Sequence, residues 1–234
     1  MKTETTPTCT DARTPGPLTL PLLVMTVLFC ASLIVANIVE IKTVDIGIAT
    51  ITAGLVVFPV TYLINDCVVE VYGFRTARMV IWLGFAMNLF VTLILQVAIW
   101  LPGSPDWEAQ QAMETIYGTV PRILVASFTA FVCGSMVNAQ VMSRMKLVSG
   151  GRNFSLRAIV STVLGEGCDS VIFFPLAFGG TLPWSVITTL IVTQTLMKTL
   201  YEILILPITL RVVAWLKRLE GLDTYDTGIR YTWW

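Results

Sequence analysis

The stretch Ile64-Asn65-Asp66-Cys67-Val68-Val69-Glu70-Val71 places two carboxylates inside a run of sequence that is otherwise apolar enough to cross a bilayer. A charged side chain in the middle of a bilayer costs roughly 3 kcal/mol on insertion scales, so it usually faces the interior of a helix bundle. Asp66 and Glu70 are four residues apart and therefore share one face of a helix. The stretch predicts a membrane helix with an inward polar face and marks a functional site.

The composition of the whole chain indicates a membrane protein. Of its 234 residues, 55% are hydrophobic and 13% are charged, whereas roughly a quarter of the residues of a soluble protein are charged. Its mean hydropathy is +0.77. A bilayer span needs about 20 apolar residues. We therefore expect an all-α polytopic membrane protein with six transmembrane helices, over 18–38, 51–71, 79–100, 123–141, 159–178 and 184–206.

The basic residues predict the orientation of these spans. If the spans alternate in direction, 12 of the 15 Lys and Arg residues fall on one side of the membrane. Only Lys42 and Arg122 fall on the other side, and Lys198 lies inside the sixth span. The positive-inside rule then places both termini in the cytoplasm. The expected domains are a flexible cytoplasmic tail, a six-helix membrane domain and a second cytoplasmic tail, over 1–17, 18–216 and 217–234.

The loops and cysteines exclude several functions. The outer loop over 101–122 is expected to carry a short amphipathic helix from Trp107 to Tyr117, but no loop is long enough for a soluble domain. No Gly-rich phosphate-binding motif occurs, so we expect no ATPase within the chain. The five cysteines lack metal-ligand spacing and the chain has no histidine. We therefore expect no metal site and no cofactor.

Intramembrane polar residues gather on three of the expected helices. The fifth carries Glu166 and Asp169 three residues apart, and the sixth carries Lys198 and Glu202 four apart. One lysine does not neutralise five carboxylates, so some are protonated, hydrated near the interface, or satisfied by a ligand that donates hydrogen bonds. A planar edge of N–H and NH2 groups, such as that of guanine, suits these acceptors, and neighbouring tyrosines can stack on its ring. The candidate substrate-binding residues are Asp66, Glu70, Asp169, Lys198, Glu202, Tyr62, Asn65, Glu166 and Tyr201.

A simpler role for the same polar residues is to hold helices together or to lie at the membrane interface. Glu70 and Glu202, near the expected inner ends of their spans, are the residues for which this alternative is strongest.

The run Phe58-Pro59-Val60-Thr61-Tyr62-Leu63, followed by Asp66 and by Glu70-Val71-Tyr72-Gly73, resembles the queuosine precursor transporter family, also described as vitamin uptake transporters. The resemblance continues through Asp169-Ser170 and through Lys198, Tyr201 and Glu202, and it covers about residues 30–226. It implies an inner-membrane importer of 7-cyano-7-deazaguanine and/or 7-aminomethyl-7-deazaguanine, which are salvaged to make queuosine in tRNA. The implied partners are the deazapurine substrate and membrane lipid, with no nucleic acid.

The resemblance also implies roles for single residues. Polar substrate contacts or gating partners are expected at Asp66, Glu70, Asp169, Lys198 and Glu202, with Tyr62, Tyr201 and Asn65 as secondary candidates. The candidacy of Glu166 rests on the argument from the residues alone.

Other functions stay open at this stage. A bundle of this kind would equally suit a vitamin importer or the substrate-binding subunit of an energy-coupled importer, and a purely structural protein is a further class. Asp66 and Asp169 would share a proton in an intramembrane aspartyl protease. However, the sequence Gly165-Glu166-Gly167-Cys168-Asp169 has one residue more than the G-x-G-D pattern of those enzymes. We expect a transporter and not an enzyme, and leave open the energy coupling, the preferred deazaguanine, and the choice between monomer and homodimer.

Overall fold

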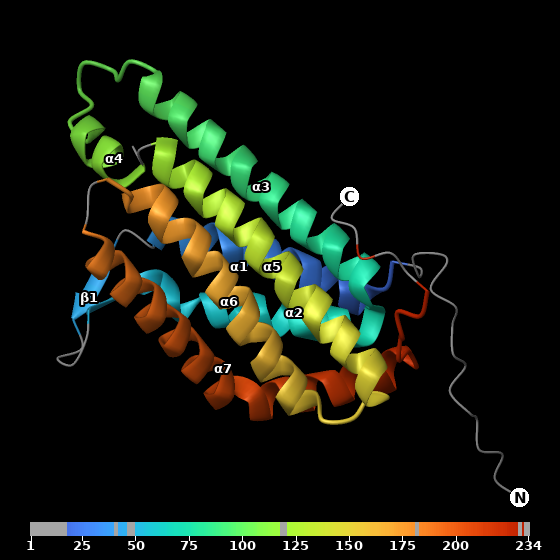
Figure 1. Cartoon of the computed structure of the whole chain (residues 1–234). Helices are drawn as coiled ribbons and strands as arrows, with labels where there is room; N and C mark the ends of the chain where they lie inside the picture. The colour runs from blue at the N-terminus through green and yellow to red at the C-terminus, as the bar shows by residue number, and fades with distance from the viewer. Residues whose placement is uncertain are drawn as a thin grey trace, which may run out of the picture.

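The computed structural model describes residues 18–39, 42–45, 50–117, 121–180, 183–228 and 231. The expected flexible tail over 1–17 lies outside these residues. In chain order the elements are α1 (Leu20–Val39), β1 (Thr43–Asp45), β2 (Thr50–Thr52), the 3-10 helix η1 (Ala53–Val56), α2 (Phe58–Tyr72), α3 (Phe74–Trp100), α4 (Gln110–Tyr117), α5 (Pro121–Ser149), α6 (Phe154–Phe178) and α7 (Trp184–Glu220). The two strands form a small antiparallel hairpin with Val44 opposite Ile51, and everything else of regular structure is helical (Figure 1).

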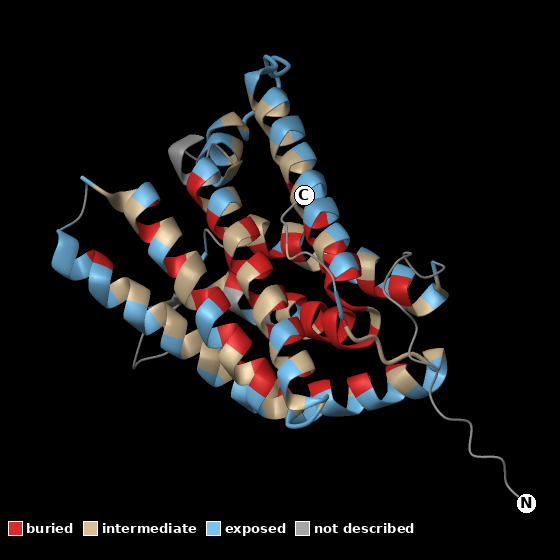
Figure 2. Cartoon of the chain, turned by 45° about the vertical axis from the view of Figure 1, so that its right-hand side comes forward, coloured by how far each residue is buried: buried red, intermediate tan, exposed pale blue. Residues whose placement is uncertain are grey.

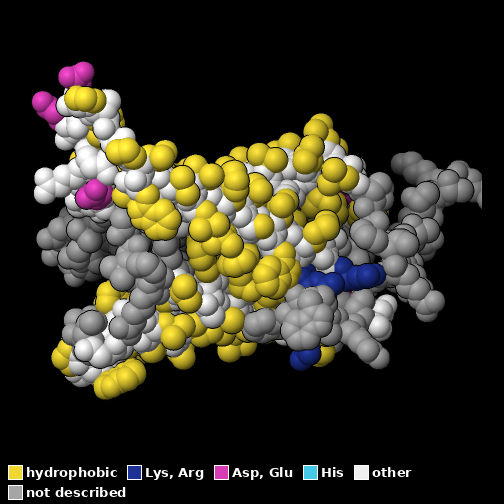
Figure 3. All heavy atoms as spheres, turned by 90° about the horizontal axis from the view of Figure 1, so that it is seen from above, with side chains coloured by type: hydrophobic (Ala, Val, Ile, Leu, Met, Phe, Trp, Pro, Cys, Tyr) yellow, Lys and Arg dark blue, Asp and Glu magenta, His cyan; other side chains and the backbone are white. Residues whose placement is uncertain are grey.

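The expectation of an α-helical membrane protein is confirmed. Five helices, α1, α3, α5, α6 and α7, are long and apolar enough to cross a bilayer. Figure 3 shows a band of hydrophobic side chains over the middle of one face, with basic side chains at one end and acidic side chains at the other. An apolar surface of this extent is unfavourable in water and suits lipid. The helix expected in the outer loop is present as α4, which begins at Gln110 rather than at Trp107.

The expected second span, 51–71, is not one continuous helix, and this part of the prediction is wrong. Its first residues form β2 and η1, and α2 has only 15 residues. At 1.5 Å per residue α2 is about 22 Å long, shorter than a hydrocarbon core of about 30 Å. Pro59 lies in the first turn of α2, where its missing N–H removes no helical hydrogen bond. Among the described residues, five helices rather than six therefore have the length of a span, and a hairpin, η1 and α2 stand in place of the expected second span.

Helix α2 lies in the centre of the bundle, in contact with α1, α3, α5 and α7. Every residue from Ile64 to Val71 is buried, and Figure 2 shows buried residues concentrated in the interior of the bundle. Along this stretch the neighbouring helices shield α2 from lipid. This enclosure explains how Asp66 and Glu70 are accommodated in an otherwise apolar helix.

Helices α5, α6 and α7 extend beyond the expected spans at the same end of the bundle, where the α2–α3 turn also lies (Figure 1). The added turns carry Lys146, Arg157 and Lys217. A span predicted from hydropathy ends at such charged residues. The helix itself can continue past them when their side chains form ion pairs inside the protein. Helix α7 also bends along its length (Figure 1), and Pro207 in its interior removes one helical hydrogen bond, a common cause of a kink.

Helices α5 and α6 pack closely where Gly134 faces Gly165. A Cβ atom built on Gly134 would lie 2.9 Å from the carbonyl oxygen of Gly165, and one on Gly165 would lie 2.8 Å from Cβ of Asn138. The Gly134 position also lies 2.9 Å from Cβ of Asp169. Small residues at this crossing therefore bring two polar side chains of adjacent helices into the bundle interior.

The chain after α7 folds back onto this end of the bundle. Thr224 N donates to the carbonyl oxygen of Val71 (3.3 Å), and Asp226 Oδ2 accepts from Phe74 N (2.9 Å) and from the Ser143 hydroxyl. The expected C-terminal tail over 217–234 therefore begins inside α7, and its described part packs against the helices rather than extending from them.

Candidate functional site

Charged and polar side chains inside the bundle form two adjacent clusters. The end cluster lies where α2, α5, α6 and α7 meet the C-terminal segment, and consists of Glu70, Lys146, Arg157, Lys217 and Asp223. The core cluster lies further into the bundle and consists of Asp66, Asn138, Glu166, Asp169, Lys198 and Glu202.

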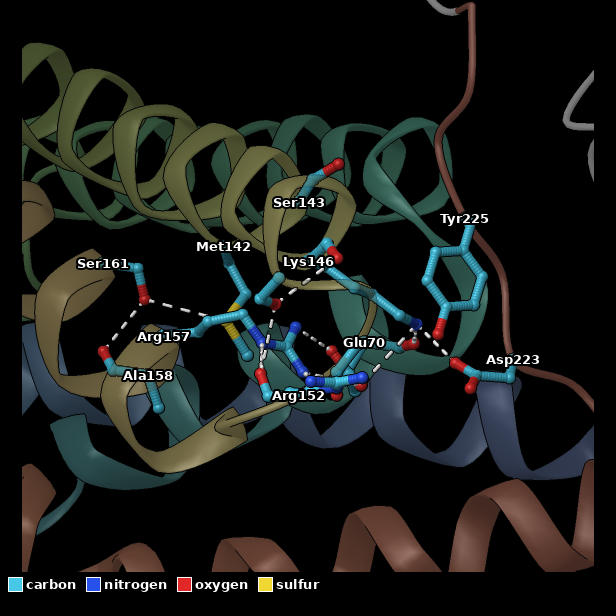
Figure 4. Close-up of polar contacts among 12 residues, drawn as sticks. Glu70, Met142, Ser143, Lys146, Arg152, Arg157, Ala158, Ser161, Asp223 and Tyr225 are labelled. Carbon is cyan, nitrogen blue, oxygen red and sulfur yellow. Dashed lines mark hydrogen bonds and ion pairs between the residues drawn. The ribbon is translucent and has the colours of Figure 1, made fainter.

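Glu70 is the centre of the end cluster (Figure 4). The guanidinium of Arg157 pairs with both of its carboxylate oxygens, at 2.6 Å from Nη1 and 3.1 Å from Nη2. Lys217 Nζ lies 2.6 Å from Glu70 Oε1, and Lys146 Nζ lies 3.6 Å from the same oxygen. Glu70 and Arg157 are each 1% exposed. Both Glu70 oxygens are thus taken up by cations of the protein itself.

Asp223 ties the C-terminal segment to this centre. Its Oδ1 lies 2.5 Å from Lys146 Nζ and 2.9 Å from Lys217 Nζ. The Tyr225 ring lies beside Lys146, with Nζ 4.7 Å from the ring centroid. Burial alone would raise the pKa of the Asp223 carboxyl, but hydrogen bonds from the two lysines outweigh it, so this pKa lies below its usual value. The end cluster fastens three helices and the C-terminal segment to α2.

In the core cluster, Lys198 bridges α7 and α6. Its Nζ lies 2.6 Å from Glu166 Oε2 and 3.5 Å from Asp169 Oδ2. Glu166 is fully buried and Asp169 is partly exposed. Lys198 therefore contacts both carboxylates that the sequence placed on the neighbouring helix, and one lysine is shared between them.

Asp66 and Glu202 lack such a cation. Asp66 Oδ1 accepts a hydrogen bond from Asn138 Nδ2 (3.2 Å), and Glu202 lies on α7, which is in contact with α2. Asp66 is 0% exposed and Glu202 is 2% exposed. In the part of the chain that the structure describes, no Lys or Arg forms an ion pair with either carboxylate.

Several buried polar atoms in and around the core cluster have no hydrogen-bond partner among the described residues. Leaving one such atom unpaired costs about 1–3 kcal/mol, so a group of them in one place indicates that a ligand or water completes the site. Acceptor oxygens outnumber donor nitrogens. The atoms are Asn65 Nδ2, Asp66 Oδ2, Asn138 Oδ1, Thr162 Oγ1, Glu166 Oε1, Thr195 Oγ1 and Glu202 Oε1.

The candidate aromatic residues lie next to this group along their helices. Tyr62 precedes Asp66 by one turn of α2, and Tyr201 is adjacent to Glu202 on α7. Both side chains are partly buried, whereas Asn65 is buried. Within the described residues, no group of three or more His, Cys, Asp or Glu side chains is placed to hold a metal ion. The described side chains of the site supply hydrogen-bond donors and acceptors, an ion pair and aromatic rings.

Comparisons with known proteins identify the family. Residues 52–212 match the family described as "Putative vitamin uptake transporter". The chain belongs to this family. It is 32% identical over 174 residues to a "Probable queuosine precursor transporter" of Bacillus subtilis (strain 168), covering 74% of this chain and 76% of that protein.

Other relatives are more distant. The "Queuosine precursor transporter" of Escherichia coli (strain K12) is 28% identical over 127 residues, which is 54% of this chain and 55% of that protein. A "Probable queuosine precursor transporter" of Haemophilus influenzae is 26% identical over 54% of this chain and 52% of that protein. No solved structure matches the chain. With bacterial relatives and five apolar helices, this family member is a multi-pass protein of the bacterial inner membrane.

The family match, 52–212, contains every residue of the core cluster but stops before Lys217 and Asp223 of the end cluster. Sequence reasoning missed the cations of the end cluster, because it assigned Lys146, Arg157 and Lys217 to loops. The count of one intramembrane lysine against five carboxylates therefore left out the ion pairs of Glu70. The sequence feature that could have indicated these cations was the Glu70 carboxylate itself, because a buried carboxylate requires a cation from another part of the chain.

Asn138 was also missed as a candidate. It lies on α5, 72 residues from Asp66 along the chain, and a single Asn in an apolar helix gives no indication of its partner. The structure thus brings Asp66, Glu166, Asp169, Lys198 and Glu202 toward one region, and assigns Glu70 to the neighbouring end cluster.

Proposed function

We propose that this protein imports queuosine precursors, 7-cyano-7-deazaguanine and/or 7-aminomethyl-7-deazaguanine, across the bacterial inner membrane for salvage into tRNA queuosine. The names of the three relatives support this substrate class. The observation that carries the proposal is the set of buried, unpartnered polar atoms around the core cluster.

The chemistry of these atoms suits a 7-deazaguanine. The N1–H and 2-amino groups of the base are adjacent donors, and carboxylate oxygens such as Asp66 Oδ2 and Glu202 Oε1 are the acceptors that such an edge requires. The base also presents a carbonyl oxygen, for which Asn65 Nδ2 is an unpartnered donor. Inside the bundle, away from water, each of these hydrogen bonds is stronger than at the surface. Tyr62 and Tyr201 are the residues proposed to stack on the ring.

The proposed topology has both termini in the cytoplasm and the α1–α3 connection as the second of six crossings. The end cluster then faces the cytoplasm, and the core cluster lies deeper in the membrane. Release of substrate to the cytoplasm requires the helices joined through Glu70 to separate, so the end cluster is proposed to act as the inner gate of an alternating-access cycle. Glu70, a candidate from the sequence, is assigned to this gate rather than to substrate contact.

The test uses bacterial cells that cannot synthesise the precursors and lack their own importer. Cells that express this protein are fed a low concentration of 7-cyano-7-deazaguanine, and the queuosine content of tRNA is measured. We expect queuosine to be restored by the wild type and by Glu108→Gln, a control on the exposed outer loop. Restoration should be lost in Asp66→Asn at equal membrane expression.

Failure of the well-expressed wild type to restore queuosine would contradict the proposal. Uptake of a vitamin by the same cells would then favour the vitamin importer that the family description names.

A further inference from the structure

Asp66 and Asn138 form a hydrogen-bonded pair in the interior of the bundle. Asn138 Nδ2 donates to Asp66 Oδ1 (3.2 Å), and the two residues are 1% and 0% exposed, respectively. This bond uses one oxygen of the carboxylate and the nitrogen of the amide. The other oxygens, Asp66 Oδ2 and Asn138 Oδ1, are buried and have no hydrogen-bond partner among the described residues. The pair therefore offers a ligand two acceptors, one from α2 and one from α5.

The carboxylate of Asp66 sets the orientation of the Asn138 amide. An ionised carboxylate only accepts hydrogen bonds, so the NH2 end of the amide faces it. The opposite orientation would place two acceptor oxygens against each other without a hydrogen between them. The amide oxygen is therefore the end of Asn138 that is left for a ligand.

The crossing of α5 and α6 holds Asn138 in position. A Cβ atom built on Gly165 would lie 2.8 Å from Cβ of Asn138, and one built on Gly134, a turn earlier on α5, would lie 2.9 Å from the carbonyl oxygen of Gly165. At contacts this close, the backbone that carries Asn138 cannot move toward α6. An acceptor fixed in this way needs little further ordering when a ligand binds.

We propose that Asn138 is a specificity-determining residue, whose Oδ1 accepts a hydrogen bond from the 2-amino group of the precursor while Asp66 Oδ2 accepts from N1–H. This inference rests on the proposed function and names the group of the substrate that the site recognises. The two donors are neighbours on one edge of the base, and the two acceptors belong to side chains joined by one hydrogen bond.

Two fixed acceptors discriminate against other bases. A hypoxanthine-type base lacks the 2-amino group and leaves Asn138 Oδ1 buried and unpaired, which weakens its binding. An adenine-type base has a ring nitrogen acceptor where guanine has N1–H, so it would place an acceptor against Asp66 Oδ2. The pair therefore selects a guanine-type edge, whichever substituent the base carries at position 7.

The test compares 7-cyano-7-deazaguanine with 7-cyano-7-deazahypoxanthine, which differs by the missing 2-amino group. Binding of each base to the purified full chain in lipid nanodiscs is measured by calorimetry. The wild type should bind the amino base at least about tenfold more tightly, because the other base leaves a buried acceptor unpaired. Asn138→Ala should bring the affinity ratio near one, mainly by weakening the amino base. Equal affinities of the two bases for the wild type would overturn the inference, whatever the variants do.

The affinity ratio separates recognition of the 2-amino group from a structural role. Loss of the bond between Asn138 and Asp66 affects both bases, because both carry N1–H, and this effect cancels in the ratio. Asn88→Ala, at another buried asparagine on α3, should keep the ratio of the wild type. A wild-type ratio in Asn138→Ala would overturn the inference. Asn138→Ser is the second variant if Asn138→Ala does not fold, and it should also bring the ratio near one, because its hydroxyl is shorter than the amide.

Failure of the proposed function looks different. In that case neither base binds to the wild type, and 7-cyano-7-deazaguanine is not taken up by cells. Binding of both bases with equal affinity, together with uptake of the amino base, would leave the proposed function standing and remove only the role of Asn138.

Discussion

At the scale of single residues, the buried carboxylates divide by whether the protein supplies their counter-ion. Glu70 is surrounded by Arg157, Lys146 and Lys217, while the side chain that hydrogen-bonds Asp66 among the described residues is the neutral amide of Asn138. A buried charge with good partners stabilises an arrangement of helices, and a buried carboxyl without one is available to a ligand. Two residues one turn apart on α2 therefore lie in different electrostatic environments.

Glu70→Gln is predicted to destabilise the protein strongly. The substitution leaves the buried Arg157 without its carboxylate, and breaking a buried pair by removal of one partner costs about 3–5 kcal/mol. Thermal unfolding of the purified protein in detergent measures the effect, with Glu108→Gln as a matched change on the exposed loop. An unchanged melting temperature would mean that the end cluster does not hold the helices together.

Asp223 predicts a pH dependence of stability. Its folded pKa lies below the unfolded value of about 3.9, so its contribution is fully present above that value and is lost as the pH falls through the folded pKa. We expect the thermal stability of the wild type to fall more steeply below pH 5 than that of Asp223→Asn. Parallel curves for the two proteins between pH 6 and pH 3 would contradict the ion pairs with Lys146 and Lys217.

At the scale of elements, the closest helix crossing positions the core cluster. Gly165 on α6 has no room for a side chain against α5, whereas a Cβ on Gly167, two residues away, would meet no atom within 4 Å. Gly165→Ala is therefore predicted to push α5 and α6 apart, to move Asn138 relative to Asp66, and to lower both stability and uptake.

Gly167→Ala is the matched control for this crossing. It lies on the same helix and should be neutral or stabilising by up to about 1 kcal/mol, because Ala favours a helix over Gly. Thermal unfolding and precursor uptake are measured for both variants. Equal behaviour of the two would show that the Gly134–Gly165 contact does not set the geometry of the site.

The helices also show which parts of the fold can be predicted from local sequence. Five of the six expected spans are helices, because a long apolar run has few alternatives in a bilayer. The prediction of the second span as one helix was wrong because mean hydropathy does not distinguish backbone conformations. Strand β2, η1 and α2 all consist largely of apolar residues, although their backbones differ. The helix ends were missed at Lys146 and Lys217, whose partner Glu70 lies 76 and 147 residues away along the chain, beyond any local pattern.

At the scale of the whole molecule, α2 connects the two clusters. Its buried stretch, Ile64 to Val71, carries Asp66 toward the core cluster and Glu70 into the end cluster. The C-terminal segment adds to the same end, where Asp226 accepts from the first backbone N–H of α3. A movement that opens the end cluster would therefore also disturb the helix that holds Asp66, and this connection would link the proposed substrate site to the proposed gate.

The most direct test of this account is uptake of labelled 7-cyano-7-deazaguanine and 7-aminomethyl-7-deazaguanine into liposomes that contain only this protein. The account predicts saturable uptake of at least one base by the wild type and by Glu108→Gln, and loss of uptake in the Asp66→Asn variant at equal reconstitution. Uptake that equals that of empty liposomes, or that is unchanged by Asp66→Asn, would contradict the claim that precursors pass through the core cluster.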